Sequence, residues 1–152
     1  MKYVHTNIIS KDWRKLVEFY TQTFDCKIIP PIRQQSGSWL SQGTGVKNAQ
    51  LEGAHLLLPG HGSSGPTLEI YQYTQIEDQA IVQPNTQGFG HIAFEVEDVE
   101  RILQKLIQNG GSRFGKVTKR LVEGVGTITF VYARDPDGNL IELQHWKTRK
   151  IF

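Results

Sequence analysis

The sequence predicts an α+β fold made of two halves that each read β-α-β-β-β. Short apolar runs with strand alternation are separated by Gly, Pro and Asn, and each half has a single segment of helical period. The halves also match one another. His91 follows His5 by 86 residues, and the same interval separates Asp98 from Asp12. Repeated order and repeated residues together indicate an internal duplication.

The first half begins with a strand over residues 3–9. A helix follows to about Phe24, and either Ser10 or Asp12 can cap it. Its buried face recurs at three- and four-residue steps, through Leu16, Val17, Phe19, Tyr20 and Phe24. Beyond it we expect an edge strand over 26–32, because two prolines interrupt it, then a long polar loop over 34–48 and strands over 49–58 and 67–73.

The second half begins with a strand over 88–96, which carries His91 among apolar residues. Asp98 is expected to cap a helix that ends at Asn109, before two glycines. Its inward positions are Val99, Ile102, Leu103 and Leu106. Further strands are predicted over 114–122, 126–133 and 140–146, with a tight turn over 135–139.

A chain of 152 residues has the length of one domain. We therefore expect a single domain over 1–152, with module one at 1–75, a polar linker at 76–87 and module two at 88–147. The matched halves predict that equivalent strand positions meet at one shared cleft.

Composition excludes several classes of function. The net charge is +2 with both signs dispersed, which gives no reason to expect a nucleic-acid partner. No apolar run is as long as a membrane span, so no membrane partner is expected. Cys26 is the single cysteine, which suits a reducing compartment, and the N-terminus shows no secretory pattern. The expectation is a cytoplasmic protein.

Four residues with metal-binding side chains stand singly on four predicted strands: His5, Glu69, His91 and Glu142. Any one of them alone has a simpler interpretation, as a hydrogen-bonded core histidine or a solvent-facing glutamate. A carboxylate on an inward strand face, however, is costly unless it is paired or ligates a metal. Two imidazoles and two carboxylates suit a divalent ion such as Zn, Ni, Co, Mn or Fe.

The sequence resembles the vicinal oxygen chelate superfamily, also called the glyoxalase/bleomycin-resistance/extradiol-dioxygenase superfamily. The resemblance covers nearly the whole chain. Its matching stretches are Val4-His5-Thr6, Asp12 with Phe19-Tyr20, Leu68-Glu69-Ile70, Gly90 to Phe94, Asn109-Gly110-Gly111, and Arg134 to Asn139 followed by Ile141-Glu142-Leu143. The resemblance implies two tandem βαβββ modules that form a cupped, eight-stranded mixed sheet around a metal, with His5, Glu69, His91 and Glu142 as the ligands.

Within that superfamily, Glu69 makes the chain most similar to glyoxalase I-like metalloproteins, because the His-His-Glu members need no ligand at that position. Two positions depart from the pattern that holds glutathione. Ile9 stands where bacterial glyoxalase I has Arg, and Tyr73 stands where Asn is usual. Both changes argue against glutathione, and another carbonyl or hydroxy-acid compound is the alternative.

The resemblance implies a metal-dependent lyase or isomerase that binds a small substrate through vicinal oxygens and transfers a proton by way of an enolate. Glu142 and Glu69 are the expected acid–base residues, with Glu142 as the mobile base. An extradiol-type dioxygenase and a non-catalytic drug-binding protein of the bleomycin-resistance kind stay open as alternatives. A homodimer is also implied. Arg33 and Arg120 are candidate anchors for an anionic substrate, although each has a solvated surface role as its alternative.

Overall fold

The computed structural model describes residues 1–78 and 80–148, without the side chain of Thr148. The chain divides into two compact units, Met1–Gln79 (unit one) and Ala80–Phe152 (unit two). The division falls inside the predicted linker, of which residue 79 lies outside the described residues. The expectation of one domain over 1–152 stays a prediction. None of the helices in the described part of the chain has the length and apolarity needed to cross a bilayer.

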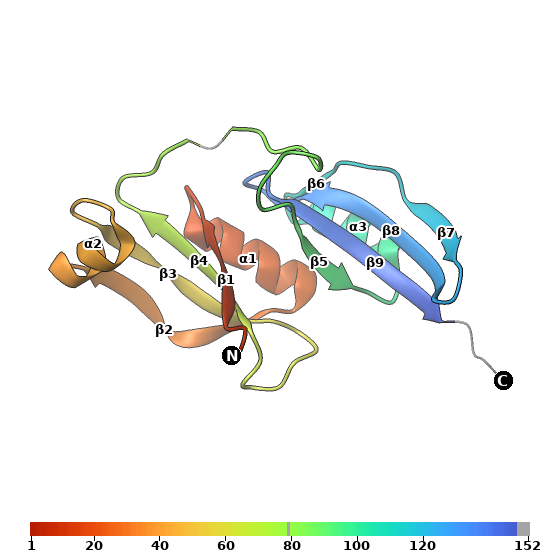
Figure 1. Cartoon of the computed structure of the whole chain (residues 1–152), viewed down its shortest axis with the longest axis horizontal. Helices are drawn as coiled ribbons and strands as arrows, with labels where there is room; N and C mark the ends of the chain where they lie inside the picture. Colours follow the sequence, from red (N-terminus) through yellow and green to blue (C-terminus); the bar gives the residue numbers. More distant parts are fainter. Residues whose placement is uncertain (79, 149–152) are drawn as a thin grey trace. The chain divides into compact units, whose positions relative to one another are not determined.

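Unit one is a four-stranded sheet with a helix against one face. Its elements in chain order are β1 (His5–Ile9), α1 (Trp13–Phe24), β2 (Lys27–Ser36), α2 (Ser38–Thr44), β3 (Gln50–Leu57) and β4 (Thr67–Tyr73). The strands lie in the order β1-β4-β3-β2; β1 pairs parallel with β4, and the other pairs are antiparallel (Figure 1). The parallel pair brings the first and last strands of the unit side by side.

Unit two repeats this plan. Its elements are β5 (Ile92–Glu95), α3 (Val99–Gln108), β6 (Ser112–Arg113), β7 (Thr118–Val122), β8 (Gly126–Arg134) and β9 (Leu140–Thr148). The sheet order is β5-β9-β8-β6, with β7 also paired to β8. The first and last main strands, β5 and β9, are again parallel neighbours. The predicted α+β class and the duplicated βαβββ order are confirmed.

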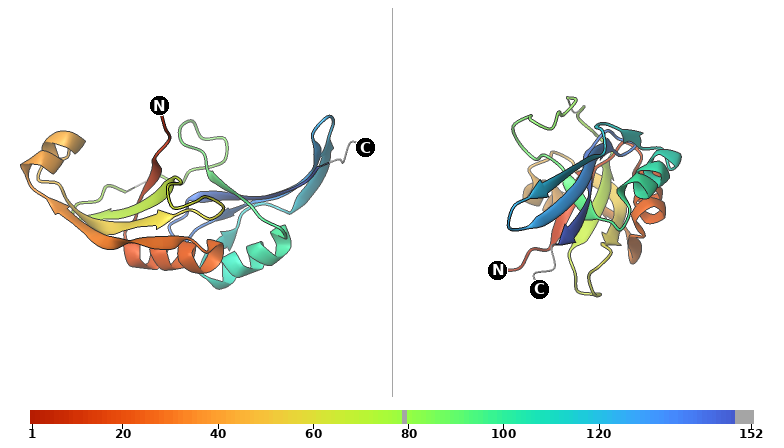
Figure 2. Two further views of the ribbon diagram at one scale, coloured as in Figure 1. Left: turned by 90° about the horizontal axis from the view of Figure 1, so that it is seen from below. Right: turned by 90° about the vertical axis from the view of Figure 1, so that its right-hand side faces the viewer.

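Helices α1 and α3 form for the reasons that their sequences indicate. Asp12 accepts a hydrogen bond from the Lys15 backbone N–H, and Asp98 accepts one from the Arg101 backbone N–H, so both are N-caps as predicted. The predicted inward residues of both helices are buried. In unit one, α1 packs on strands β3 and β4 and leaves the opposite face of the sheet for other groups (Figure 2).

The structure corrects three predicted elements. Residues 34–48 are not a continuous loop, because β2 extends to Ser36 and is followed by α2, whose Leu40 is buried. The strand predicted over 88–96 is only β5, since Gly88 has a φ of 127° and the chain becomes regular at Ile92. The strand predicted over 114–122 is regular only as β7, from Thr118, and the short β6 lies before the predicted start. The prediction of β2 as an edge strand is confirmed.

Candidate metal centre

In unit one, the parallel pairing of β1 with β4 brings His5 to Glu69. Asn7 is the residue opposite Glu69, and His5 lies two positions earlier on the same face of β1. The Nδ1 atom of His5 is 3.2 Å from Oε1 of Glu69. Two of the four sequence-predicted residues are therefore in contact.

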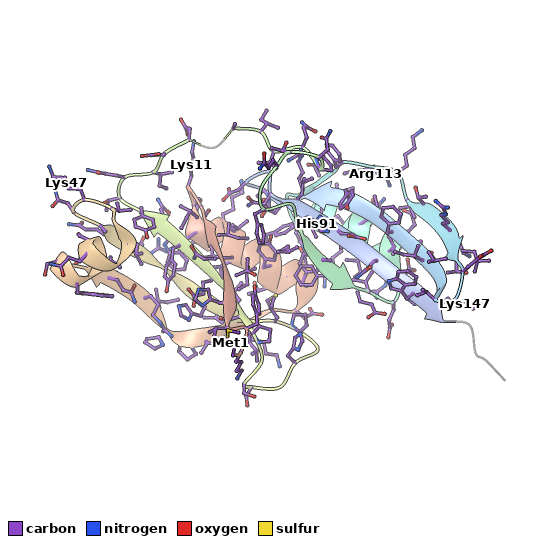
Figure 3. The ribbon with its side chains drawn as sticks, in the orientation of Figure 1. Met1, Lys11, Lys47, His91, Arg113 and Lys147 are labelled. Carbon is purple, nitrogen blue, oxygen red and sulfur yellow. The ribbon has the colours of Figure 1, made fainter. Side chains whose placement is uncertain are left out.

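In unit two, the parallel pairing of β5 with β9 produces the same arrangement. Ala93 is the residue opposite Glu142, and His91 again lies two positions earlier, where the chain enters β5 (Figure 3). The Nε2 atom of His91 is 2.9 Å from Oε2 of Glu142. The two units therefore match in their His–Glu side-chain contacts as well as in their strand order.

Both carboxylates are mostly withdrawn from solvent. The side chain of Glu69 is 12% exposed and that of Glu142 is 15% exposed. At this burial a carboxylate needs a partner, and each has an imidazole. Imidazole nitrogen and carboxylate oxygen are both ligands that divalent transition-metal ions bind. The chemistry of each His–Glu pair therefore fits such an ion.

A third imidazole, His55, meets Glu69 from β3. The antiparallel register places His55 directly opposite Glu69, and its Nε2 lies 3.4 Å from the same Oε1 atom that His5 contacts. The Nε2 atom is also 2.5 Å from the hydroxyl of Tyr71. Burial lowers the pKa of His55, and the negative charge of Glu69 acts in the opposite direction.

Sequence reasoning missed the part played by His55. A histidine within an apolar strand is a signal that the residue has a role, and His55 shows that signal. The residue opposite it, however, depends on the register between β3 and β4. In unit two the equivalent position opposite Glu142 is Tyr132, whose ring centroid lies 5.0 Å from that of His91. The two halves are therefore alike in their His–Glu pairs and differ at this third position.

The structure forms no complete metal cluster on its own. Over residues 1–78 and 80–148, no group of three or more His, Cys, Asp or Glu side chains is placed to hold an ion. The four predicted ligands are found as two pairs, one in each unit. Whether the four act on one ion stays a prediction.

The sheet face that carries Glu69 extends along β4, away from the predicted ligands. Tyr71 and Tyr73 follow Glu69 at two-residue steps, and Tyr73 packs on a small cluster formed by Leu40, Ala49, Leu51 and Tyr71. Ile9 is opposite Tyr71 on β1 and is 44% exposed. Both positions that differ from the glutathione-binding pattern therefore lie on the same face as Glu69.

Two other features lie outside the predicted ligand set. A hollow of about 480 Å³ contains none of the predicted ligands, and Leu51 and Tyr73 are among its lining residues, together with Gln50 and Gln72. Cys26 is buried, and burial raises the pKa of its thiol to about 12, so a thiolate nucleophile is not supported there.

Comparison with known proteins identifies relatives over nearly the whole chain. The model of the Glyoxalase/Bleomycin resistance protein/Dioxygenase superfamily matches residues 2–143. A lactoylglutathione lyase of Escherichia coli O157:H7 is 26% identical over 149 residues, which cover 94% of this chain and 91% of that protein. A lactoylglutathione lyase of Arabidopsis thaliana is 26% identical over 148 residues, covering 93% of this chain and 43% of that protein. The chain thus spans less than half the length of this plant relative.

Solved structures support the fold. A glyoxalase family protein from Bacillus cereus superposes with a TM-score of 0.74 at 21% identity, covering 96% of this chain and 93% of that one. A glyoxalase I mutant from Zea mays superposes with a TM-score of 0.63 at 22% identity, covering 94% of this chain and 44% of that one. At these identities the likeness concerns the fold alone.

Proposed function

Because this chain belongs to the glyoxalase/bleomycin resistance protein/dioxygenase superfamily, we propose that it is a metal-dependent lyase or isomerase. Its substrate is a small molecule that presents two vicinal oxygens, and the reaction moves a proton on a carbon next to a carbonyl. The observation that carries the proposal is the repeated His–Glu pair. Each pair sits on the parallel first and last strands of its unit, with the same two-residue offset.

A structural role alone gives a weaker account of this repetition. One partly buried His–Glu pair contributes little to stability once desolvation is subtracted, so two of them at equivalent positions give a small structural benefit. Binding of a divalent ion accounts for the presence of a His–Glu pair in each unit. The ligands in this proposal are His5, Glu69, His91 and Glu142, and the candidate ions are Zn, Ni, Co, Mn and Fe.

When bound, such an ion would polarise the two substrate oxygens and favour loss of a proton from the adjacent carbon. The protein must supply the base. Glu142 suits this role, because its described contact is with one imidazole, His91, whereas Oε1 of Glu69 is contacted by both His5 and His55. The less restrained carboxylate is the better candidate to move and accept the proton, and Glu69 is the candidate to return it.

The substrate that we propose is a small carbonyl or hydroxy-acid compound. The relatives named above are lactoylglutathione lyases, so lactoylglutathione is the first compound to test. Ile9 and Tyr73 lie on the Glu69 face and offer an alkyl group and a phenol there, with no charged or amide group for glutathione. We therefore expect little activity with glutathione and more with small 2-oxo or 2-hydroxy compounds.

The experiment is metal-dependent proton exchange. The protein is stripped with a chelator, reloaded separately with each of the five ions, and incubated in deuterated water with lactoylglutathione and a panel of 2-oxo and 2-hydroxy acids. We expect exchange at the carbon next to the carbonyl with one or two of the ions and none in the stripped protein. Equal exchange with and without metal would contradict the proposal, and oxygen uptake with a catechol would favour the dioxygenase alternative instead.

A homodimer and a cytoplasmic location are part of the same proposal. Light scattering during size-exclusion chromatography tests the homodimer, with twice the mass of one chain as the expected result.

Fractionation of the source cells tests the cytoplasmic location, with the protein expected in the soluble fraction.

A further inference from the structure

Arg33 lies on the same face of the unit-one sheet as Glu69. It is opposite Gly53 on β3, and Gly53 is in turn opposite Tyr71 on β4. His55 and Glu69 form the next pair on this face, two residues farther along their strands. Two strand spacings and one two-residue step separate the Cα atoms of Arg33 and Glu69 by about 12 Å. A long arginine side chain covers part of that distance and leaves space for a small molecule.

The guanidinium of Arg33 has free hydrogen-bonding capacity. Its described hydrogen bond goes to the backbone carbonyl of Pro31, and no carboxylate in the described part of the chain lies within ion-pair distance of it. A guanidinium has five N–H donors in a planar fork that matches a carboxylate. Arg33 is half-buried, so this capacity is presented at the protein surface rather than inside the core.

We propose that Arg33 binds an anionic group of the substrate, a carboxylate, that is a few bonds away from the two oxygens directed at the metal. This inference rests on the proposed function, and it narrows the substrate class to small 2-oxo or 2-hydroxy acids with a further carboxylate. Arg33 is then the residue that sets specificity, because the His and Glu side chains around Glu69 offer an anion no fixed positive charge.

The test uses a matched pair of ligands. 2-Oxoglutarate carries vicinal oxygens and a distal carboxylate, and 2-oxoglutaramate has an uncharged amide in place of that carboxylate. Calorimetric titration of each into the metal-loaded protein measures the preference for the anion. We compare the wild type with Arg33→Gln, with Arg33→Lys, and with Arg120→Gln, which removes an exposed arginine from β7 in unit two. Metal content and melting temperature are recorded for each variant.

The wild type should bind 2-oxoglutarate about 10- to 100-fold more tightly than the amide, as expected for a charge-assisted hydrogen bond. Arg33→Gln should remove this preference without changing the affinity for the amide, Arg33→Lys should keep part of it, and Arg120→Gln should keep all of it. An unchanged preference in Arg33→Gln would overturn the anchor and leave the proposed function standing. Failure of the metal-loaded wild type to bind 2-oxoglutarate would also overturn the anchor, whereas failure to bind metal would overturn the proposed function and the anchor with it.

Discussion

Replacement of Glu142 by glutamine is expected to lower the rate of proton transfer by about 100- to 10,000-fold. The amide has nearly the same shape as the carboxylate but cannot accept a proton from carbon. Because Glu142 lies within β9, opposite Ala93, and the substitution changes no backbone group, it should leave the strand pairing intact. The rate is measured as deuterium exchange into the best substrate of the panel, at saturating metal, with the bound metal quantified in the same sample.

Glu123→Gln is the matched control. It is the same substitution in the same unit, at an exposed position in the turn between β7 and β8, and it should exchange at the wild-type rate. Full activity of Glu142→Gln at normal metal content would mean that another group is the base, and Glu69 would then be the next candidate.

Replacement of Gly53 by alanine is expected to destabilise unit one by about 3 kcal/mol. A Cβ atom at this position would lie 2.0 Å from the backbone carbonyl oxygen of Ile70 and 2.6 Å from the ring of Tyr71. The backbone oxygen belongs to the neighbouring strand, so relief requires β3 and β4 to separate. Tyr71 would be displaced from His55, and the environment of Glu69 would change with it. Urea denaturation gives the free energy of unfolding.

Gly43→Ala is the control for this substitution. Gly43 lies in helix α2, and a Cβ there would meet no atom within 4 Å. Alanine favours helix over glycine by up to about 1 kcal/mol, so this variant should be as stable as the wild type or slightly more stable. Equal denaturation midpoints for Gly53→Ala and Gly43→Ala would contradict the account of close packing between β3 and Tyr71.

Much of the fold could be predicted because the signals are local. Asp12 and Asp98 are caps that act within one turn of helix, and the apolar periods of α1 and α3 are read directly from the sequence. The errors concern features that local signals do not determine. The helix α2 follows a polar stretch and depends on the burial of Leu40 against the sheet, which the sequence of that stretch alone does not reveal.

The candidate site was predicted in part for a similar reason. The His–Glu pairs could be anticipated because the chain is duplicated, so His5 and Glu69 point to His91 and Glu142 without knowledge of the strand register. No such repetition exists for His55, since Tyr132 takes its place in unit two. The contact of His55 with Glu69, and the position of Arg33 on the same face, depend on which residues are opposite one another across three strands.

The metal content of the purified protein, measured by elemental mass spectrometry, tests the central claim most directly. The variants are Glu69→Gln, His91→Ala and, as a control, Glu52→Gln, whose carboxylate lies on the other face of the unit-one sheet and accepts a hydrogen bond from Arg14. We predict about one transition metal per chain in the wild type and in Glu52→Gln. The other two variants should retain much less metal, because each lacks one of the four proposed ligands and should lose more than about tenfold in metal affinity. Full metal content in Glu69→Gln and His91→Ala, or no metal in the wild type after reconstitution, would contradict the proposed ligands.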